Sequence, residues 1–213
     1  MVSLLFRGEI LLFALITIAL ILSLSFHEYA HAAVARLFGD RTAEMAGRLT
    51  INPLAHIDPM GLLMVVLVGF GYARPVPVDP RFLRSPRADL WVAAAGPAMN
   101  LLLAVVVWNG FLLLRGADFG FVFMPASETF VVLLVRINLI LMLFNLIPLG
   151  PLDGHWILPH LLPDTAARWY RFNNARYGTY VLFGLIMLVV AGVPVFRGLM
   201  TIGARLMRLI TFV

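Results

Sequence analysis

The chain contains no cysteine and no lysine, and charged residues of any kind are few. The absence of cysteine excludes cysteine metal ligands, a cysteine nucleophile and a disulfide scaffold. Only 13% of the 213 residues are charged, whereas 62% are hydrophobic. Soluble domains have about 25% charged and about 45–50% apolar residues, so this composition excludes an ordinary soluble enzyme and a disordered chain. We therefore expect a polytopic membrane protein.

Long apolar segments predict the fold. One continuous helical pattern near the N-terminus is long enough to cross a bilayer and project beyond it. The fold class that we expect is an all-α polytopic membrane protein with about five to six transmembrane helices, a re-entrant segment and a small β element near the active site. The predicted spans are 9–38, 90–114, 129–147 and 178–193, with 60–73 as the re-entrant segment and 195–213 as a further apolar segment.

Arginine is distributed unevenly between the connecting segments. Segments 36–59, 74–87 and 148–176 contain three, four and three arginines, whereas 115–128 contains one. Arginine-rich loops face the cytoplasm in membrane proteins. The same bias accounts for the net charge of +5, so nucleic acid is not an expected partner. We expect a multi-pass membrane protein in which these three segments face the cytoplasm.

The run His27-Glu28-Tyr29-Ala30-His31 is the strongest functional signal. On a helix, His27 and His31 share one face because they are four residues apart. Two imidazoles at this spacing can hold one zinc ion, and Glu28 is then placed to take a proton from bound water. An ionisable side chain inside a membrane costs about 2.5–3.5 kcal/mol, so three together need a compensating partner. The alternative is a polar helix end whose histidines bond to nearby carbonyls.

A catalytic zinc site needs a third protein ligand. The candidates are His56, Asp58, Asp153, His155 and His160. Asp153 follows Pro148 and Pro151, which end a helix, so it lies on an irregular segment at membrane depth. Its spacing leaves two roles open, a metal ligand or an N-cap of the next helix. Asp58 also fits a turn, and His155 and His160 also fit the membrane interface.

Two sequence runs resemble the signature motifs of the site-2 protease family of intramembrane zinc metalloproteases. They are HEYAH at 27–31 and NLIPLGPLDG at 145–154. The stretches GRLTINPLAHIDPMG at 47–61 and AAAGPAMN at 93–100 are similar to short prokaryotic members, which have no PDZ or CBS domain. The resemblance covers roughly residues 20–160.

The resemblance implies a residue set and an activity. It implies one Zn²⁺ per chain, with His27, His31 and Asp153 as ligands and Glu28 as general base and acid. For Asn145 it implies a role in stabilising the oxyanion or positioning substrate. The implied activity is endopeptidase cleavage in or near transmembrane segments of membrane proteins, as in regulated intramembrane proteolysis.

Two other functions are alternatives to proteolysis. A metal transporter would need further intramembrane ligands along a path, and the later predicted spans contain no acid or histidine,. A non-catalytic membrane chaperone would have no need of Glu28 beside the metal. Replacing Glu28 with glutamine separates the three, because only a protease loses turnover while it keeps zinc.

Residues 72–78 fit a strand in which Pro75 and Pro77 place both missing N–H groups on one edge. The other edge keeps the N–H groups of Arg74, Val76 and Val78. We expect that edge to pair with residues 46–51 or with an extended substrate. The alternative is a proline-rich loop lying on the lipid headgroups.

One membrane-embedded metalloprotease domain is expected over residues 1–213, with a core at about 9–160 and C-terminal helices at about 177–213. The expected partners are a transmembrane protein substrate and membrane lipid. The sequence leaves the oligomeric state open and allows a homo-oligomer.

Overall fold

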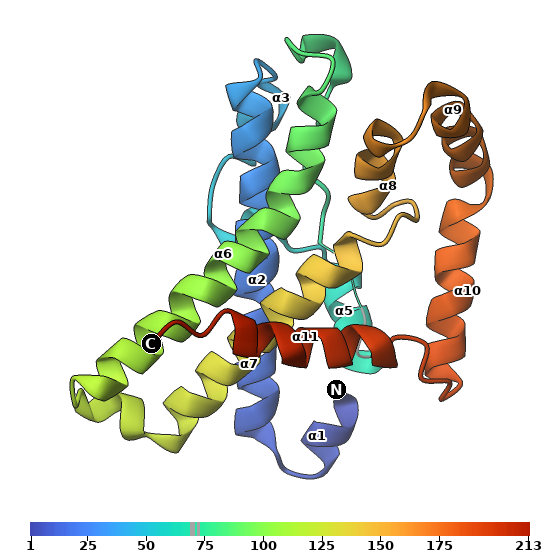
Figure 1. Cartoon of the computed structure of the whole chain (residues 1–213). Helices are drawn as coiled ribbons and strands as arrows, with labels where there is room; N and C mark the ends of the chain where they lie inside the picture. The colour runs from blue at the N-terminus through green and yellow to red at the C-terminus, as the bar shows by residue number, and fades with distance from the viewer. Residues whose placement is uncertain (69–70, 72) are drawn as a thin grey trace.

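The computed structural model describes residues 1–68, 71 and 73–213, and helices make up its regular structure there (Figure 1). Three long helices form its centre: α2 (Ile10–Leu37), α6 (Ala88–Gly116) and α7 (Pro125–Asn145). The shorter elements are α1 (Val2–Phe6), α3 (Thr42–Met45), α4 (Pro53–His56), α5 (Pro59–Val68), η1 (Pro80–Phe82), η2 (Gly120–Phe123), α8 (Gly154–Ile157), η3 (Leu158–Leu161), α9 (Asp164–Asn173), η4 (Asn174–Gly178), α10 (Thr179–Val190) and α11 (Arg197–Leu209).

The three central helices are the candidate membrane spans of the described residues, by length and composition. They contain 28, 29 and 21 residues. At helical rise these lengths are about 42, 44 and 32 Å, against a hydrocarbon core of about 30 Å. The helices agree with the predicted spans 9–38, 90–114 and 129–147 to within a few residues. The described part of the chain thus confirms three of the predicted spans, and the count of five to six is not confirmed there. The predicted segments 178–193 and 195–213 fall largely on α10 and α11, which have 12 and 13 residues.

The re-entrant prediction falls on α5, which the structure describes over Pro59–Val68. Residues 69, 70 and 72 of the predicted segment lie outside the described residues. The ten described residues of α5 cover about 15 Å at helical rise,.

No strand occurs in residues 1–68, 71 and 73–213, so the predicted β element is not found there. The strand predicted at 72–78 begins at a residue outside this part, and its remainder is extended but not in a sheet. Arg74 N–H donates to the His56 carbonyl (2.9 Å), and Val76 N–H donates to Glu28 Oε2 (3.1 Å). The expected donor edge therefore bonds to acceptors on α4 and α2, and not to a ladder with residues 46–51.

Small residues lie at the contacts between the central helices. The buried ones include Ala19, Ala30, Ala32 and Ala35 on α2 and Ala88, Ala93, Gly96 and Ala104 on α6. Small side chains let helix backbones approach closely, which is how helices associate where lipid supplies no hydrophobic driving force. Large apolar side chains such as Leu102 and Val106 point outward and are more than half exposed. Such a surface fits contact with hydrocarbon better than contact with water.

The C-terminal part lies beside the three central helices. In Figure 1, α11 runs across the long helices instead of along them, and it contacts α7. The chain after α11 bonds to α6, where Asn109 Nδ2 donates to the Ile210 carbonyl (2.7 Å) and Asn109 Oδ1 accepts from Phe212 N–H (2.8 Å). These contacts fix the C-terminus on the far side of the bundle from α8 and α9 (Figure 1).

Candidate metal centre

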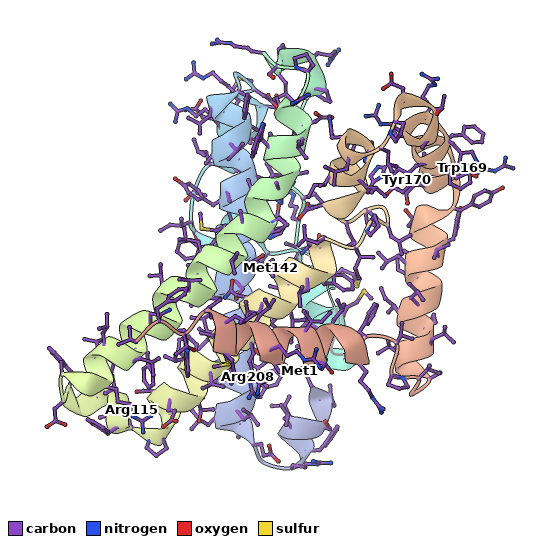
Figure 2. The ribbon with its side chains drawn as sticks, in the orientation of Figure 1. Met1, Arg115, Met142, Trp169, Tyr170 and Arg208 are labelled. Atoms are coloured by element: carbon purple, nitrogen blue, oxygen red, sulfur yellow. The ribbon has the colours of Figure 1, made fainter. Side chains whose placement is uncertain are left out.

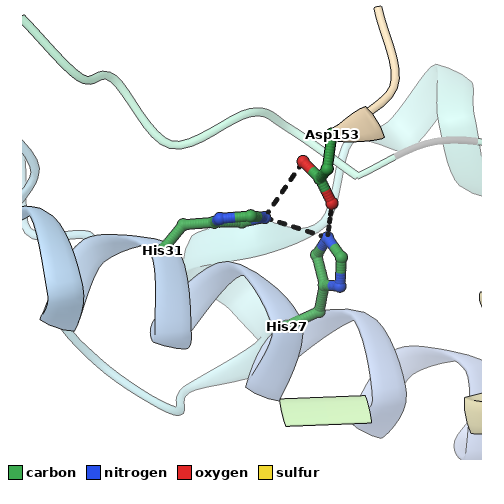
Figure 3. Close-up of side chains that lie close together, drawn as sticks. All are labelled: His27, His31 and Asp153. Atoms are coloured by element: carbon green, nitrogen blue, oxygen red, sulfur yellow. Dashed lines mark hydrogen bonds and ion pairs between the residues drawn. The ribbon is translucent and has the colours of Figure 1, made fainter. Parts of the chain in front are cut away.

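His27, His31 and Asp153 meet inside the bundle (Figure 3). Both histidines project from one face of α2, and Asp153 approaches them from the segment before α8. His27 Nε2 lies 3.2 Å from Asp153 Oδ2, and His31 Nε2 lies 3.4 Å from Asp153 Oδ1. The two Nε2 atoms are 3.0 Å apart. The structure thus brings together the three residues for which the sequence predicted metal binding.

Asp153 is the N-cap residue of α8, but its carboxylate makes no capping hydrogen bond there among the described residues. The carboxylate points at the two imidazoles instead. Of the two roles that spacing left open, the geometry favours the ligand. Gly154 follows because a Cβ at that position would lie 2.6 Å from the Ile147 carbonyl oxygen. Glycine therefore allows the Asp153 segment to fold back against the end of α7.

The outer ring nitrogens determine the tautomer of each histidine. His31 Nδ1 lies 2.7 Å from the Val92 carbonyl, which only accepts, so Nδ1 carries the proton,. His27 Nδ1 lies 2.7 Å from Asn100 Oδ1. The Asn100 amide nitrogen donates to Asn138 Oδ1 (2.8 Å), so Asn100 Oδ1 accepts from His27. In their neutral forms, both imidazoles therefore present the lone pair of Nε2 toward Asp153.

Convergence of these lone pairs is the main argument for a cation. With both imidazoles neutral, two unprotonated nitrogens and a carboxylate face one another in a buried site, and acceptors without a donor between them repel. The ligand atoms lie within 4.8 Å of one another. Asp153 Oδ2 is buried and accepts no hydrogen bond from the described residues. A bound cation satisfies all three groups.

The donor set and spacing fit zinc. Two imidazole nitrogens and one carboxylate oxygen are a common ligand set of catalytic zinc sites, in which a fourth position stays open. Ligands at about 2.0 Å from a tetrahedral ion lie about 3.3 Å apart. The distances of 3.0, 3.2 and 3.4 Å between the ligand atoms agree with that value. One zinc ion per chain therefore fits His27, His31 and Asp153.

Gly96 makes room for the two imidazoles. A Cβ at position 96 would lie 2.6 Å from His27 Nε2 and would also collide with His31 Nε2. Glycine thus lets α6 approach the face of α2 that carries the ligands. The same helix supplies the Val92 carbonyl and the Asn100 side chain, which accept hydrogen bonds from Nδ1 of His31 and of His27. The close contact with both imidazoles therefore explains why position 96 is a glycine.

A series of hydrogen bonds continues from His27 through Asn100 to Asn138 and Ser23. Asn138 Nδ2 donates to Ser23 Oγ (2.8 Å), and Ser23 Oγ donates to the Ala19 carbonyl (2.7 Å). Asn100, Asn138 and Ser23 are completely buried. This series therefore links α2, α6 and α7 directly beneath the ligand His27. Asn138 and Ser23 were not predicted as functional residues, although a strongly polar residue inside a spanning helix indicates a hydrogen-bond partner.

Glu28 lies next in sequence to His27 and is bound by the extended segment 73–79. Its Oε2 accepts from Val76 N–H (3.1 Å). The guanidinium of Arg48, which is nearly buried, bonds to the carbonyls of Ala55, Arg74 and Pro75. Arg48 therefore fixes the segment whose amide orients the Glu28 carboxylate.

His56 and Asp58 do not join the metal cluster. His56 Nε2 donates to the Thr50 carbonyl (2.7 Å) and is buried. Asp58 Oδ1 accepts from Met60 N–H and Gly61 N–H, both at 2.9 Å. Asp58 therefore caps the start of α5, in agreement with the turn role that its sequence allowed.

His155 and His160 also have other partners. His160 Nε2 lies 3.1 Å from Asp89 Oδ1 at the start of α6. His155 Nδ1 lies 2.5 Å from Asn174 Nδ2, which donates to it. Burial, and to a smaller extent the charge of Arg171, lowers the pKa of His155 and so favours its neutral form. Neither histidine belongs to the group of ligand atoms around Asp153.

Asn145 is the last residue of α7, and its side chain is turned back to its own helix. Asn145 Nδ2 donates to the Leu141 carbonyl (3.0 Å). This bond is of the type that a polar side chain makes within a membrane helix. The predicted role of Asn145 requires the amide to leave this bond.

Comparison with known proteins agrees with this centre. The model of Peptidase family M50 matches residues 15–124 and 121–189. A Bacillus subtilis protein named "Putative zinc metalloprotease YwhC" is 45% identical over 189 residues, which cover 80% of this chain and 85% of that protein. No solved structure matches.

Two mycobacterial relatives are longer. Proteins named "Putative zinc metalloprotease Rip2" from Mycolicibacterium smegmatis and Mycobacterium tuberculosis are 36% and 33% identical over 162 and 163 residues. The matches cover 72% of this chain and 60% of each relative, so the chain spans about 60% of their length. With a family match over most of its residues and a cluster that fits zinc, the chain belongs to peptidase family M50, the site-2 protease family.

Proposed function

We propose that the protein is an intramembrane zinc endopeptidase that hydrolyses peptide bonds in or near transmembrane segments of other membrane proteins. The observation that carries the proposal is the convergence of three metal-ligand atoms beside Glu28, within three helices long enough to span a membrane. Membership of a peptidase family supports it. A site on a spanning helix gives access to substrates that lie in the bilayer.

The proposed chemistry assigns proton transfer to Glu28. When bound, zinc supplies Lewis acidity, which lowers the pKa of its water toward about 7 and polarises the substrate carbonyl. Glu28 accepts the proton of the attacking water and returns it to the leaving amine. Val76 N–H, at 3.1 Å, holds the carboxylate in place for both transfers. The Val92 carbonyl and Asn100 keep the imidazoles in the tautomer that presents Nε2 to the metal,.

Asn145 is proposed to hold the substrate near the metal centre. It ends α7, and the segment that follows it carries Asp153. Its Nδ2 now bonds to Leu141 in its own helix and would exchange this bond for the oxyanion,. A substrate helix must unwind before cleavage, because a helical peptide bond is hydrogen-bonded and shielded. An extended substrate segment is therefore the form that the site receives.

We also propose that the site faces the cytoplasm from a prokaryotic plasma membrane. In Figure 1, the arginine-rich segments around α3, η1 and α9 lie toward one end of the bundle, opposite the turn between α6 and α7. This segregation supports the orientation through the positive-inside rule. Because the chain has no cysteine, Pro86→Cys and Ala126→Cys each provide a single labelling site on opposite ends. An impermeant maleimide added to intact cells should label Cys at position 126 and spare position 86.

Cleavage itself is tested with Glu28→Gln as the matched control. Wild type and Glu28→Gln are expressed at equal levels in a bacterial membrane, and new protein N-termini in that membrane are identified by mass spectrometry. We expect new termini within or next to transmembrane segments with the wild type only. If both proteins bind zinc and neither produces such termini, the proposal of an intramembrane endopeptidase is wrong.

A further inference from the structure

The segment that carries Asp153 is held from outside by one long helical element. Helical dihedral angles continue from α9 through η4 into α10, because the residues at both junctions, Asn173 to Asn174 and Gly178 to Thr179, are all in the right-handed helical region. The chain is therefore helical from 164 to 190. In Figure 1 this element stands beside α8, on the side away from α2 and α6.

Asn174 makes the central contacts between this element and the segment 148–155. Its side chain is buried. Asn174 Oδ1 accepts from Gly150 N–H (3.1 Å), and Asn174 Nδ2 donates to His155 Nδ1 (2.5 Å). Tyr170 Oη, one helical turn earlier, donates to the Pro148 carbonyl (2.9 Å). Figure 2 shows Tyr170 on the side of α9 toward α8. One amide thus bonds to both sides of the metal ligand in sequence.

The π-helical turn η4 provides the space for this amide. Asn174 begins the turn and Gly178 ends it. A Cβ on Gly178 would lie 2.7 Å from Asn174 Cγ and 3.1 Å from Asn174 Nδ2. The glycine therefore leaves the volume that the Asn174 side chain fills. Single π-helical turns cost helix regularity and recur at functional positions.

Apolar packing supports the same segment. Leu152, which directly precedes the metal ligand, is buried with Leu182 and Ile186 of α10. The place of the ligand therefore depends on how the backbone of 148–155 is held.

We infer that Asn174 is a positioning residue for the metal ligand Asp153, and that it couples the helical element 164–190 to the metal centre. The inference rests on the metal-binding part of the proposed function and not on proteolysis. Residues that orient metal ligands from outside typically change metal affinity by about 10–100-fold when they are replaced. Asn174 acts through backbone and His155, so its loss should shift Asp153 without removing a ligand.

The test compares Asn174→Leu with Asn173→Leu in the full chain. Asn173 is a matched control, because it precedes Asn174 in the same helix and directs its amide to the Trp169 carbonyl of that helix (2.8 Å). Zn²⁺ affinity is measured by chelator competition, and the visible spectrum of the Co²⁺-loaded protein reports ligand geometry. We expect Asn174→Leu to lose about 10–100-fold in affinity and to change the Co²⁺ bands. Asn173→Leu should match the wild type in both.

Gly178→Ala is the second variant and keeps every hydrogen-bonding group. Its methyl group displaces the Asn174 amide, so the affinity and the Co²⁺ bands should change in the same direction, even if Asn174→Leu does not fold. Wild-type affinity and bands in Gly178→Ala, or in folded Asn174→Leu, overturn the inference. Asp153→Ala serves as the reference. If Asp153→Ala keeps zinc as well, the assignment of the metal centre is wrong together with the inference. If only Asp153→Ala loses zinc, the inference alone fails.

Discussion

Replacing Gly96 with alanine should disrupt the metal centre from a helix that supplies no ligand. The added Cβ would lie 2.6 Å from His27 Nε2, about 0.8 Å nearer than an ordinary van der Waals contact,. The same Cβ collides with His31 Nε2. Movement of either imidazole away from the Cβ therefore changes the spacing of the two ligand nitrogens. Zinc ligand distances tolerate only about 0.2 Å. A shift of several tenths of an ångström therefore separates at least one ligand from the ion.

The expected effect is a loss of zinc affinity of at least about 100-fold, which corresponds to about 2.7 kcal/mol. Gly110→Ala is the matched control, since it changes the same residue type in the same helix where a Cβ meets nothing within 4 Å. Alanine is the better helix former by about 1 kcal/mol, so Gly110→Ala should keep zinc and gain thermal stability. Chelator competition measures affinity for both. Zinc binding by Gly96→Ala that equals that of Gly110→Ala would refute the steric argument.

Three further predictions follow from the surroundings of the metal. Asn100→Leu removes the acceptor of His27 Nδ1, so zinc affinity in the same competition assay should fall about 10–100-fold. Asn138→Leu removes the partner of Asn100 and should lower zinc affinity by less. Equal affinities in all three proteins would contradict the assigned tautomer. Val76→Pro removes the N–H that binds Glu28, so peptide cleavage should fall while zinc content stays at one per chain; unchanged cleavage would argue against this contact. Chelation should lower the melting temperature and added Zn²⁺ should restore it, with a stabilisation of about 2.7 kcal/mol at 100-fold excess over Kd. A melting temperature insensitive to zinc would count against a site formed in the folded state.

Local signals were sufficient to predict the central helices and the pairing of His27 with His31. The spans on α2, α6 and α7 follow from continuous apolar runs, and helical spacing alone places His27 and His31 on one face. Asp153 required a motif resemblance, because its spacing fits a helix cap equally well. Only its position against the imidazoles, seen in three dimensions, distinguishes the two roles.

Features that depend on contacts between distant segments were not predictable. The partner of His27 is Asn100, 73 residues away, and the next link is Asn138. No spacing in the sequence specifies such a series of hydrogen bonds. The strand expected at 72–78 is not found in the described residues for the same reason, because the Val76 amide donates to the Glu28 carboxylate and not to residues 46–51. The proline pattern determined which amides are available but not what they bind.

Metal content of the purified protein tests the central claim most directly. Wild type, Asp153→Ala and Glu28→Gln are purified in parallel, and zinc per chain is measured by elemental analysis. The arrangement of His27, His31 and Asp153 predicts one zinc per chain in the wild type and in Glu28→Gln, and its loss in Asp153→Ala. Zinc retained without Asp153, or no zinc in the wild type after zinc is supplied, would contradict the assigned metal centre.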